Sequence, residues 1–163
     1  MKTSPTIVVI ALALAPFAAA ETPTRKETTM TQHARGPFDV KVLPQPADEK
    51  VGHPAVARMA LDKKFHGDLE GVSLGQMLAF MGESQDSGSY VAVERVDGTL
   101  GGRKGTFALH HLGIMDKGAQ NMTIGVVPGS ATGELAGLSG TMKIIIAPGG
   151  AHSYELDYEL PAR

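Results

Sequence analysis

Hydrophobic and polar residues alternate with a period of two along most of the chain from Phe38 onward. The clearest run lies near the C-terminus, where His152, Tyr154, Leu156, Tyr158 and Leu160 alternate with Ser153, Glu155, Asp157 and Glu159. Successive side chains of a strand point to opposite faces, so this pattern predicts a strand with one buried and one solvated face. No window shows the spacing of an amphipathic helix. The body of the chain is therefore predicted to be all-β.

The same criterion predicts about eight strands. The first places Phe38, Val40 and Val42 on one face, and the second does the same with Ala57, Met59, Leu61 and Phe65. Six more are expected near residues 72–81, 90–96, 106–112, 121–127, 141–147 and 152–160. Spacings of this kind are typical of all-β domains.

Glycine-containing dipeptides between these runs predict how the strands are connected. Asp97-Gly98 and Gly149-Gly150 have the residues of tight antiparallel hairpins, whereas Gly101-Gly102 is interpreted as a bulge or bend because it follows so closely. Eight antiparallel strands form either a sandwich or a closed barrel. The closed barrel is favoured because closure leaves no exposed sheet edge.

The N-terminal segment has the features of a secretory signal peptide. Lys2 precedes an apolar run over residues 7–15, and small residues end the segment at Ala20. The run is too short to cross a bilayer as a helix, so no membrane anchor is expected after cleavage. We predict a signal peptide at 1–20, a polar flexible leader at 21–35 and a barrel domain at 36–161, in a secreted or periplasmic protein. Translation from Met30 would instead give a cytosolic form.

Composition excludes several classes of function. Among 163 residues there is no cysteine, which excludes disulfides, a thiol nucleophile and cysteine-ligated metals. The net charge is −2, and no basic run is present, so nucleic acid is not expected as a partner.

Several glycine-anchored blocks in order carry a resemblance to a known family. They read KKFHGDLEGVS, YVAVERVDGTLGGRKGTFALHHLG, VVPGSATGELAGLSGTM and GGAHSYELDYEL. They resemble a bacterial family of unknown function whose members adopt an allene oxide cyclase-like barrel, and the likeness covers about residues 36–161. The resemblance implies a single closed eight-stranded antiparallel barrel, often a homodimer. It implies no particular activity, because cyclases, stereochemical guide proteins and uncharacterised members share this barrel.

An eight-stranded barrel is wide enough either to fill itself with side chains or to hold one small ligand. The apolar face of the last strand offers His152, Tyr154 and Tyr158, and His111 shares a face with neighbouring apolar residues. These four are candidate ligand-binding residues. The alternatives are that the phenol hydroxyls reach the barrel mouth or a backbone carbonyl, and that His111 is a hydrogen-bonded core histidine.

Glu94 and Tyr90 are the candidate catalytic residues, because they alternate in phase with Ala92 and Val96. An inward carboxylate in apolar surroundings is expected to have a raised pKa, which suits proton transfer near neutral pH. The alternative is a structural ion pair with Lys63 or with neighbours of Arg95. Lys63 itself is expected at the barrel rim with its ammonium in water, or else as the partner of an internal carboxylate.

No metal site and no cofactor are expected. His110 and His111 point to opposite faces, and the sequence has neither an HxH nor an HExxH motif. The sequence thus predicts an exported barrel that binds a small apolar or amphipathic molecule in its lumen. The alternative is a cyclase- or isomerase-type enzyme acting on a hydrophobic substrate, so whether the protein is an enzyme stays open. A third hypothesis is a filled barrel that acts through its surface or a dimer contact.

Overall fold

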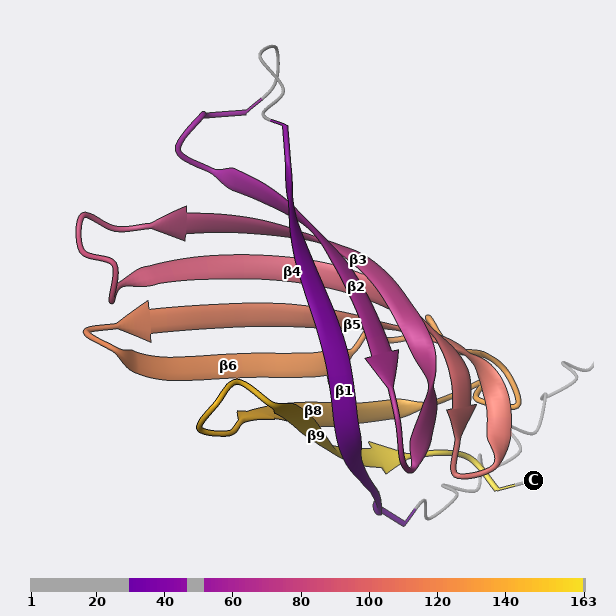
Figure 1. The fold of residues 1–163 in the computed structure, drawn as a ribbon. Helices are drawn as coiled ribbons and strands as arrows, with labels where there is room; N and C mark the ends of the chain where they lie inside the picture. The colour runs from indigo at the N-terminus through magenta and orange to yellow at the C-terminus, as the bar shows by residue number, and fades with distance from the viewer. Residues whose placement is uncertain (1–29, 47–51, 163) are drawn as a thin grey trace, which may run out of the picture.

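The computed structural model describes residues 30–46 and 52–162. Nine antiparallel strands form one sheet in this part of the chain (Figure 1). They are β1 (Gln32–Gln45), β2 (Ala57–Phe65), β3 (Leu69–Met81), β4 (Gly88–Leu100), β5 (Arg103–Asp116), β6 (Ala119–Val126), β7 (Thr132–Gly133), β8 (Ser139–Ile146) and β9 (His152–Glu159). The strand order is β4-β3-β2-β1-β9-β8-β6-β5, and the β4–β5 pairing closes it into a ring. The short β7 is added to β5. The predicted closed eight-stranded antiparallel barrel is confirmed.

The first strand begins earlier than predicted. Residues 32–35 belong to β1 and pair with β9, and the Ala34 side chain is buried in the core. The prediction of a flexible leader through residue 35 was therefore wrong at its end, because the apolar side of this pairing was too short to show as a pattern. The predicted signal peptide at 1–20 and the rest of the leader lie outside the described residues. In the described part of the chain, no helix is long and apolar enough to cross a membrane.

The hairpin between β4 and β5 turns at a different place from the one predicted. Asp97 and Gly98 lie inside β4, and the two-residue turn is Gly101-Gly102, with φ of 56° and 78°. Both residues need positive φ, which glycine adopts without strain. A Cβ on Gly98 would lie 2.4 Å from the Glu70 carbonyl oxygen, so this glycine allows two strands to approach closely. The interpretations of Asp97-Gly98 as the turn and of Gly101-Gly102 as a bulge were both wrong.

The barrel interior is filled at one end. The core there contains Phe65, Leu69, Leu100 and Phe107, together with Leu135 from the connection between β6 and β8. All of these side chains are almost completely buried. Space for a ligand inside the barrel therefore lies toward the other end, which we call the mouth.

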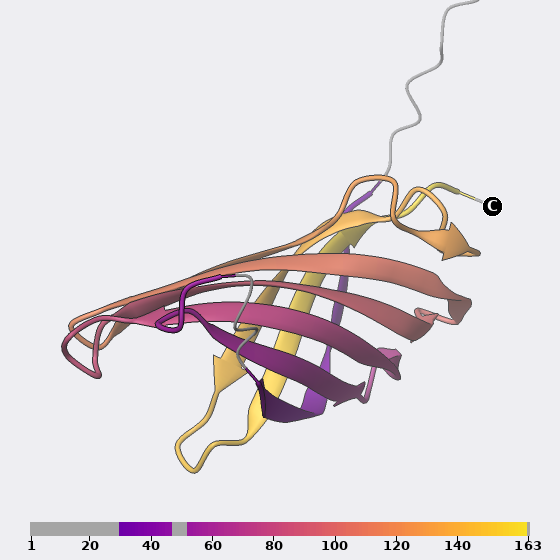
Figure 2. The same ribbon diagram turned by 90° about the horizontal axis from the view of Figure 1, so that it is seen from above.

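The mouth is where the hairpins β3–β4, β5–β6 and β8–β9 turn. In Figures 1 and 2 the β8–β9 hairpin diverges from the β5–β6 hairpin. The pairing agrees, because β6 and β8 share only two residue pairs, Ile124 with Met142 and Gly125 with Thr141. In contrast, β3 and β4 are paired along their whole length. The wall of the barrel is therefore paired over only a short stretch between β6 and β8.

Candidate functional site

A cavity of about 710 Å³ opens at the mouth of the barrel. The side chains around it are mostly apolar and come from the mouth ends of β2 to β6 and β8. Its lining consists of Ala55, Ala57, Met59, Met77, Ala79, Met81, Gly88, Ser89, Tyr90, Gly113, Ile114, Met115, Gln120, Met122 and Ile146. None of these residues carries a charge. The volume falls within the range of about 300–1,000 Å³ that is usual for small-molecule sites.

Five methionines give this wall its character. Strand alternation points Met59 and Met77 inward, and the register places them directly opposite each other on β2 and β3. Met122 lies opposite Gly113 on the far side of the mouth. Unbranched thioether side chains adapt to differently shaped apolar partners. The wall can therefore adjust to the molecule it holds.

Tyr90 is the predicted site residue that lines the cavity. Its ring lies over Gly113, which faces it across the β4–β5 pairing, and a Cβ on Gly113 would fall 2.0 Å from the ring. The hydroxyl reaches across to β6, where it donates to Met122 Sδ at 3.5 Å. Burial, and secondarily the negative charge of Glu94, raises the pKa of Tyr90. The phenol is therefore neutral at physiological pH and acts as a donor.

A buried cluster of four polar side chains lies one level deeper, between the cavity and the core. Lys63 Nζ donates to Glu94 Oε1 at 2.7 Å, and His111 Nε2 lies 2.9 Å from the same oxygen. Ser73 Oγ donates to Glu94 Oε2 at 2.7 Å. Glu94 is only 1% exposed and Lys63 only 4%. The cluster joins β2, β3, β4 and β5 through one carboxylate.

The electrostatics of this cluster differ from the sequence expectation in two ways. Burial alone would raise the pKa of Glu94, but the hydrogen bond with His111, the charge and hydrogen bond of Lys63 and the hydrogen bond of Ser73 lower it to about 2. The expected raised pKa was wrong, because the desolvation is outweighed by these partners. The expected place of Lys63 at the rim was also wrong, and the alternative of an internal ion pair is what the structure shows.

Local packing prepares the space for this carboxylate. Gly75 on β3 is paired with Glu94 on β4, and a Cβ on Gly75 would lie 2.5 Å from the Glu94 Cβ. On the other side, Lys63 Nζ lies 5.5 Å from the centre of the Phe38 ring, within reach of a cation–π interaction. The cluster is thus fitted into the barrel by a glycine and an aromatic ring.

The other candidate residues do not line the cavity. Tyr154 donates its hydroxyl to the His66 carbonyl oxygen at 3.1 Å and accepts from the Leu69 amide at 2.8 Å. Tyr158 donates to Gln32 Oε1 at 3.2 Å, and the His152 ring packs against Phe38. For Tyr154, the alternative of a phenol bonded to the backbone is what the structure shows.

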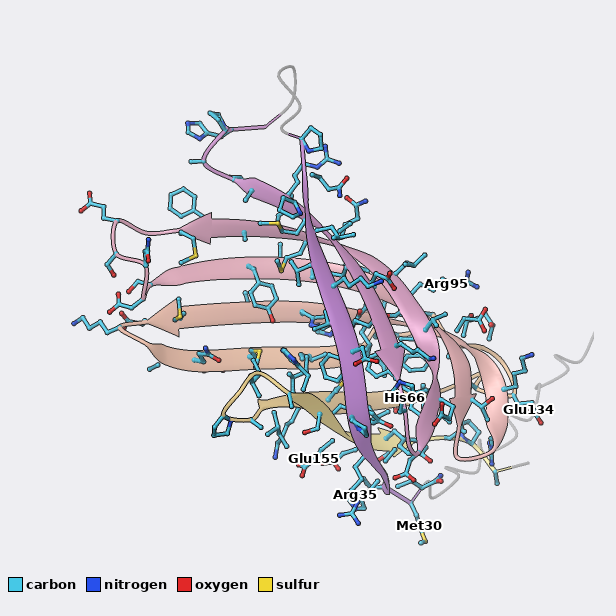
Figure 3. All side chains as sticks on the ribbon, viewed as in Figure 1. Met30, Arg35, His66, Arg95, Glu134 and Glu155 are labelled. Carbon is cyan, nitrogen blue, oxygen red and sulfur yellow. The ribbon has the colours of Figure 1, made fainter. Side chains whose placement is uncertain are left out.

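His111 is hydrogen-bonded inside the barrel, so the alternative of a hydrogen-bonded core histidine is what the structure shows. Among the described residues, no group of three or more His, Asp or Glu side chains is arranged to hold a metal ion. The labelled charged side chains Arg95 and Glu134 lie toward the filled end of the barrel (Figure 3).

Sequence reasoning missed the methionines as site residues. Met59 was placed on one face of its strand with Ala57, Leu61 and Phe65, but no methionine was expected to line a site. The available signal was that inward methionines recur near the same end of successive strands, such as Met77 on β3 and Met115 on β5.

The fold and the cavity define the class: a single-domain, closed antiparallel β-barrel with a small apolar chamber at one end. The chain belongs to the DUF3224 family, described as a protein family of unknown function, whose profile matches residues 34–158. A solved structure of a DUF3224 protein of unknown function from Shewanella oneidensis MR-1 is 43% identical, with a TM-score of 0.74. The match covers 82% of this chain and 100% of that one. None of the curated proteins matches the chain.

Proposed function

We propose that this protein is an exported barrel that holds one small apolar or amphipathic molecule in the cavity at its mouth. The observation that carries the proposal is the uncharged, methionine-rich lining of a chamber of about 710 Å³. Apolar area removed from water contributes about 25 cal/mol per Å², so enclosing a small apolar molecule here supplies several kcal/mol. Export is supported by the signal-like residues 1–20.

The cyclase or isomerase alternative has less support. Glu94 is not among the residues that line the cavity, and both of its carboxylate oxygens are hydrogen-bonded. Its lowered pKa makes it a carboxylate that holds its charge, which does not suit a proton donor near neutral pH. We therefore do not propose catalysis by Glu94.

The experiment is a fluorescence titration of the purified protein with N-phenylnaphthylamine, a neutral apolar fluorophore. Ala79→Phe fills part of the cavity, and Leu78→Phe places the same aromatic ring on the exposed outer face of the same strand. An area of about 50 Å² lost from contact corresponds to about tenfold in affinity. We expect Ala79→Phe to weaken binding by about that factor and Leu78→Phe to leave it unchanged. If the fluorophore does not bind, or if both variants bind it like the wild type, the proposal is wrong.

A further inference from the structure

The three tyrosines of the chain use their hydroxyl groups differently. Tyr154 and Tyr158 both donate to oxygen atoms. Tyr90 donates to the sulfur of Met122 at 3.5 Å. A thioether is a weak acceptor, so this contact is a poor substitute for a bond to oxygen. Tyr90 is also the tyrosine that lines the cavity.

The position of the Tyr90 hydroxyl is fixed by its surroundings. Tyr90, Gly113 and Met122 occupy one row across β4, β5 and β6. Because Gly113 has no side chain, the Tyr90 ring can lie over it and extend toward Met122. A ring held in this way presents its donor at one place in the wall, and a flexible methionine can move aside for a better acceptor.

The rest of the lining offers little competing polarity. The Ser89 hydroxyl is already used, because it donates to the Gly113 carbonyl oxygen at 3.0 Å. Gln120 is exposed at the rim. Among the described residues, no lysine, arginine or histidine lines the cavity to pair with an anion, and no carboxylate lines it to pair with a cation. Enclosing an unpaired charge in such a chamber is costly.

We infer that the cavity takes a neutral apolar molecule with one acceptor oxygen, such as a ketone, ester or ether, and that the Tyr90 hydroxyl donates to that oxygen. This inference rests on the proposed function and adds the chemical class of the ligand and the residue that recognises it. The apolar body lies against the methionines, and the single oxygen replaces Met122 as the partner of Tyr90. Because Tyr90 is uncharged, it provides selectivity for the acceptor without favouring an anion.

The test compares two naphthalene ligands that differ in one group. Acetylnaphthalene has a carbonyl oxygen where isopropenylnaphthalene has a CH₂ group, so their shapes are nearly the same. Dissociation constants are measured by fluorescence titration for the wild type, Tyr90→Phe and Tyr158→Phe. The last variant loses the same hydroxyl from a tyrosine that does not line the cavity.

We expect Tyr90→Phe to weaken binding of the ketone by about three- to tenfold, the usual net effect of one hydrogen bond. Binding of the alkene should change by less than about twofold. Tyr158→Phe should leave the ratio of the two constants as in the wild type. If both ligands bind and Tyr90→Phe does not change their ratio, the inference is wrong while the proposed function stands. If neither ligand binds the wild type, the proposed function fails as well.

Two further measurements need no variant. The carbonyl carbon of ¹³C-labelled acetylnaphthalene in the wild-type complex should resonate downfield of its position in an apolar solvent, because hydrogen bonding deshields it. A resonance at the position found in an apolar solvent would overturn the role of Tyr90. Naphthoate, the anionic counterpart, should bind more weakly than the ketone, and tighter binding of naphthoate would overturn the neutral class of ligand.

Discussion

Replacing Glu94 by glutamine should destabilise the barrel strongly at neutral pH and much less in acid. The substitution keeps the size of the side chain but removes the charge that faces Lys63 at 2.7 Å. The ammonium is then left buried without a counter-charge, which typically costs about 3–5 kcal/mol. The lowering of the Glu94 pKa from 4.5 to about 2 gives a second estimate of about 3 kcal/mol, at about 1.4 kcal/mol per pKa unit. The two estimates agree.

The pH dependence has a definite sign. Because the pKa of Glu94 is lower in the folded state, its stabilising contribution is complete above the unfolded value of 4.5 and is lost as the pH falls through about 2. The difference in free energy of unfolding between the wild type and Glu94→Gln should therefore be about 3 kcal/mol at neutral pH and shrink progressively over this window. Taking the difference removes the effect of the other carboxylates, which titrate in both proteins.

The assay is urea unfolding followed by circular dichroism at a series of pH values. Glu155→Gln is the matched control, because this glutamate is exposed on β9, and it should change stability by less than about 0.5 kcal/mol. Adding Lys63→Met to Glu94→Gln should recover part of the loss, since the unpaired ammonium is removed. A destabilisation by Glu94→Gln that stays constant down to acid pH would refute the assignment of the charge to Glu94.

Three other outcomes can be checked separately. Gly113→Ala should displace the Tyr90 ring, because its Cβ would lie 2.0 Å from a ring carbon, and should cost about 1–3 kcal/mol of stability in a urea titration. Peroxide oxidation of Met59 and Met77 to sulfoxides should weaken binding of N-phenylnaphthylamine, since the wall becomes polar; mass spectrometry gives the extent, and unchanged affinity at full oxidation would contradict this. After expression in a bacterial host with a periplasm, the periplasmic protein should have the mass of a chain that begins at Glu21. Protein found in the cytosol with residues 1–20 still attached would contradict export.

The fold could be predicted because it depends mainly on the alternation of inward and outward side chains along each strand. The alternation around Glu94 showed that it shares a face with Ala92 and Val96, and all three are buried in the barrel. This alternation is a local property of each strand, so it can be recognised in a single sequence. The position of a residue along the barrel axis depends instead on the register between strands distant in sequence. Lys63 was misplaced at the rim for that reason, since its partner Glu94 lies on another strand.

The cavity was harder to predict than the barrel. Its existence depends on which part of the barrel interior is filled by side chains. The core at the other end includes Leu135, which comes from an irregular connection where the alternation of strand residues gives no prediction. The aromatic and histidine residues of β9 drew attention because of their chemistry. Their polar atoms are used within the fold, whereas the cavity wall is built from methionines whose side chains carry no distinctive functional group.

Under the proposed function, the short pairing between β6 and β8 offers a route by which a ligand enters and leaves the cavity. Below the two shared residue pairs the strands separate, and the cavity is lined by Gln120 and Met122 on one side of this seam and by Ile146 on the other. We expect a ligand to pass between β6 and β8 when these two strands move apart beyond their two shared pairs, while the other strand pairings stay closed. Slow native-state hydrogen exchange in β3 and β4, combined with fast exchange for the amides of β6 and β8 that face each other beyond these two pairs, would indicate such local opening.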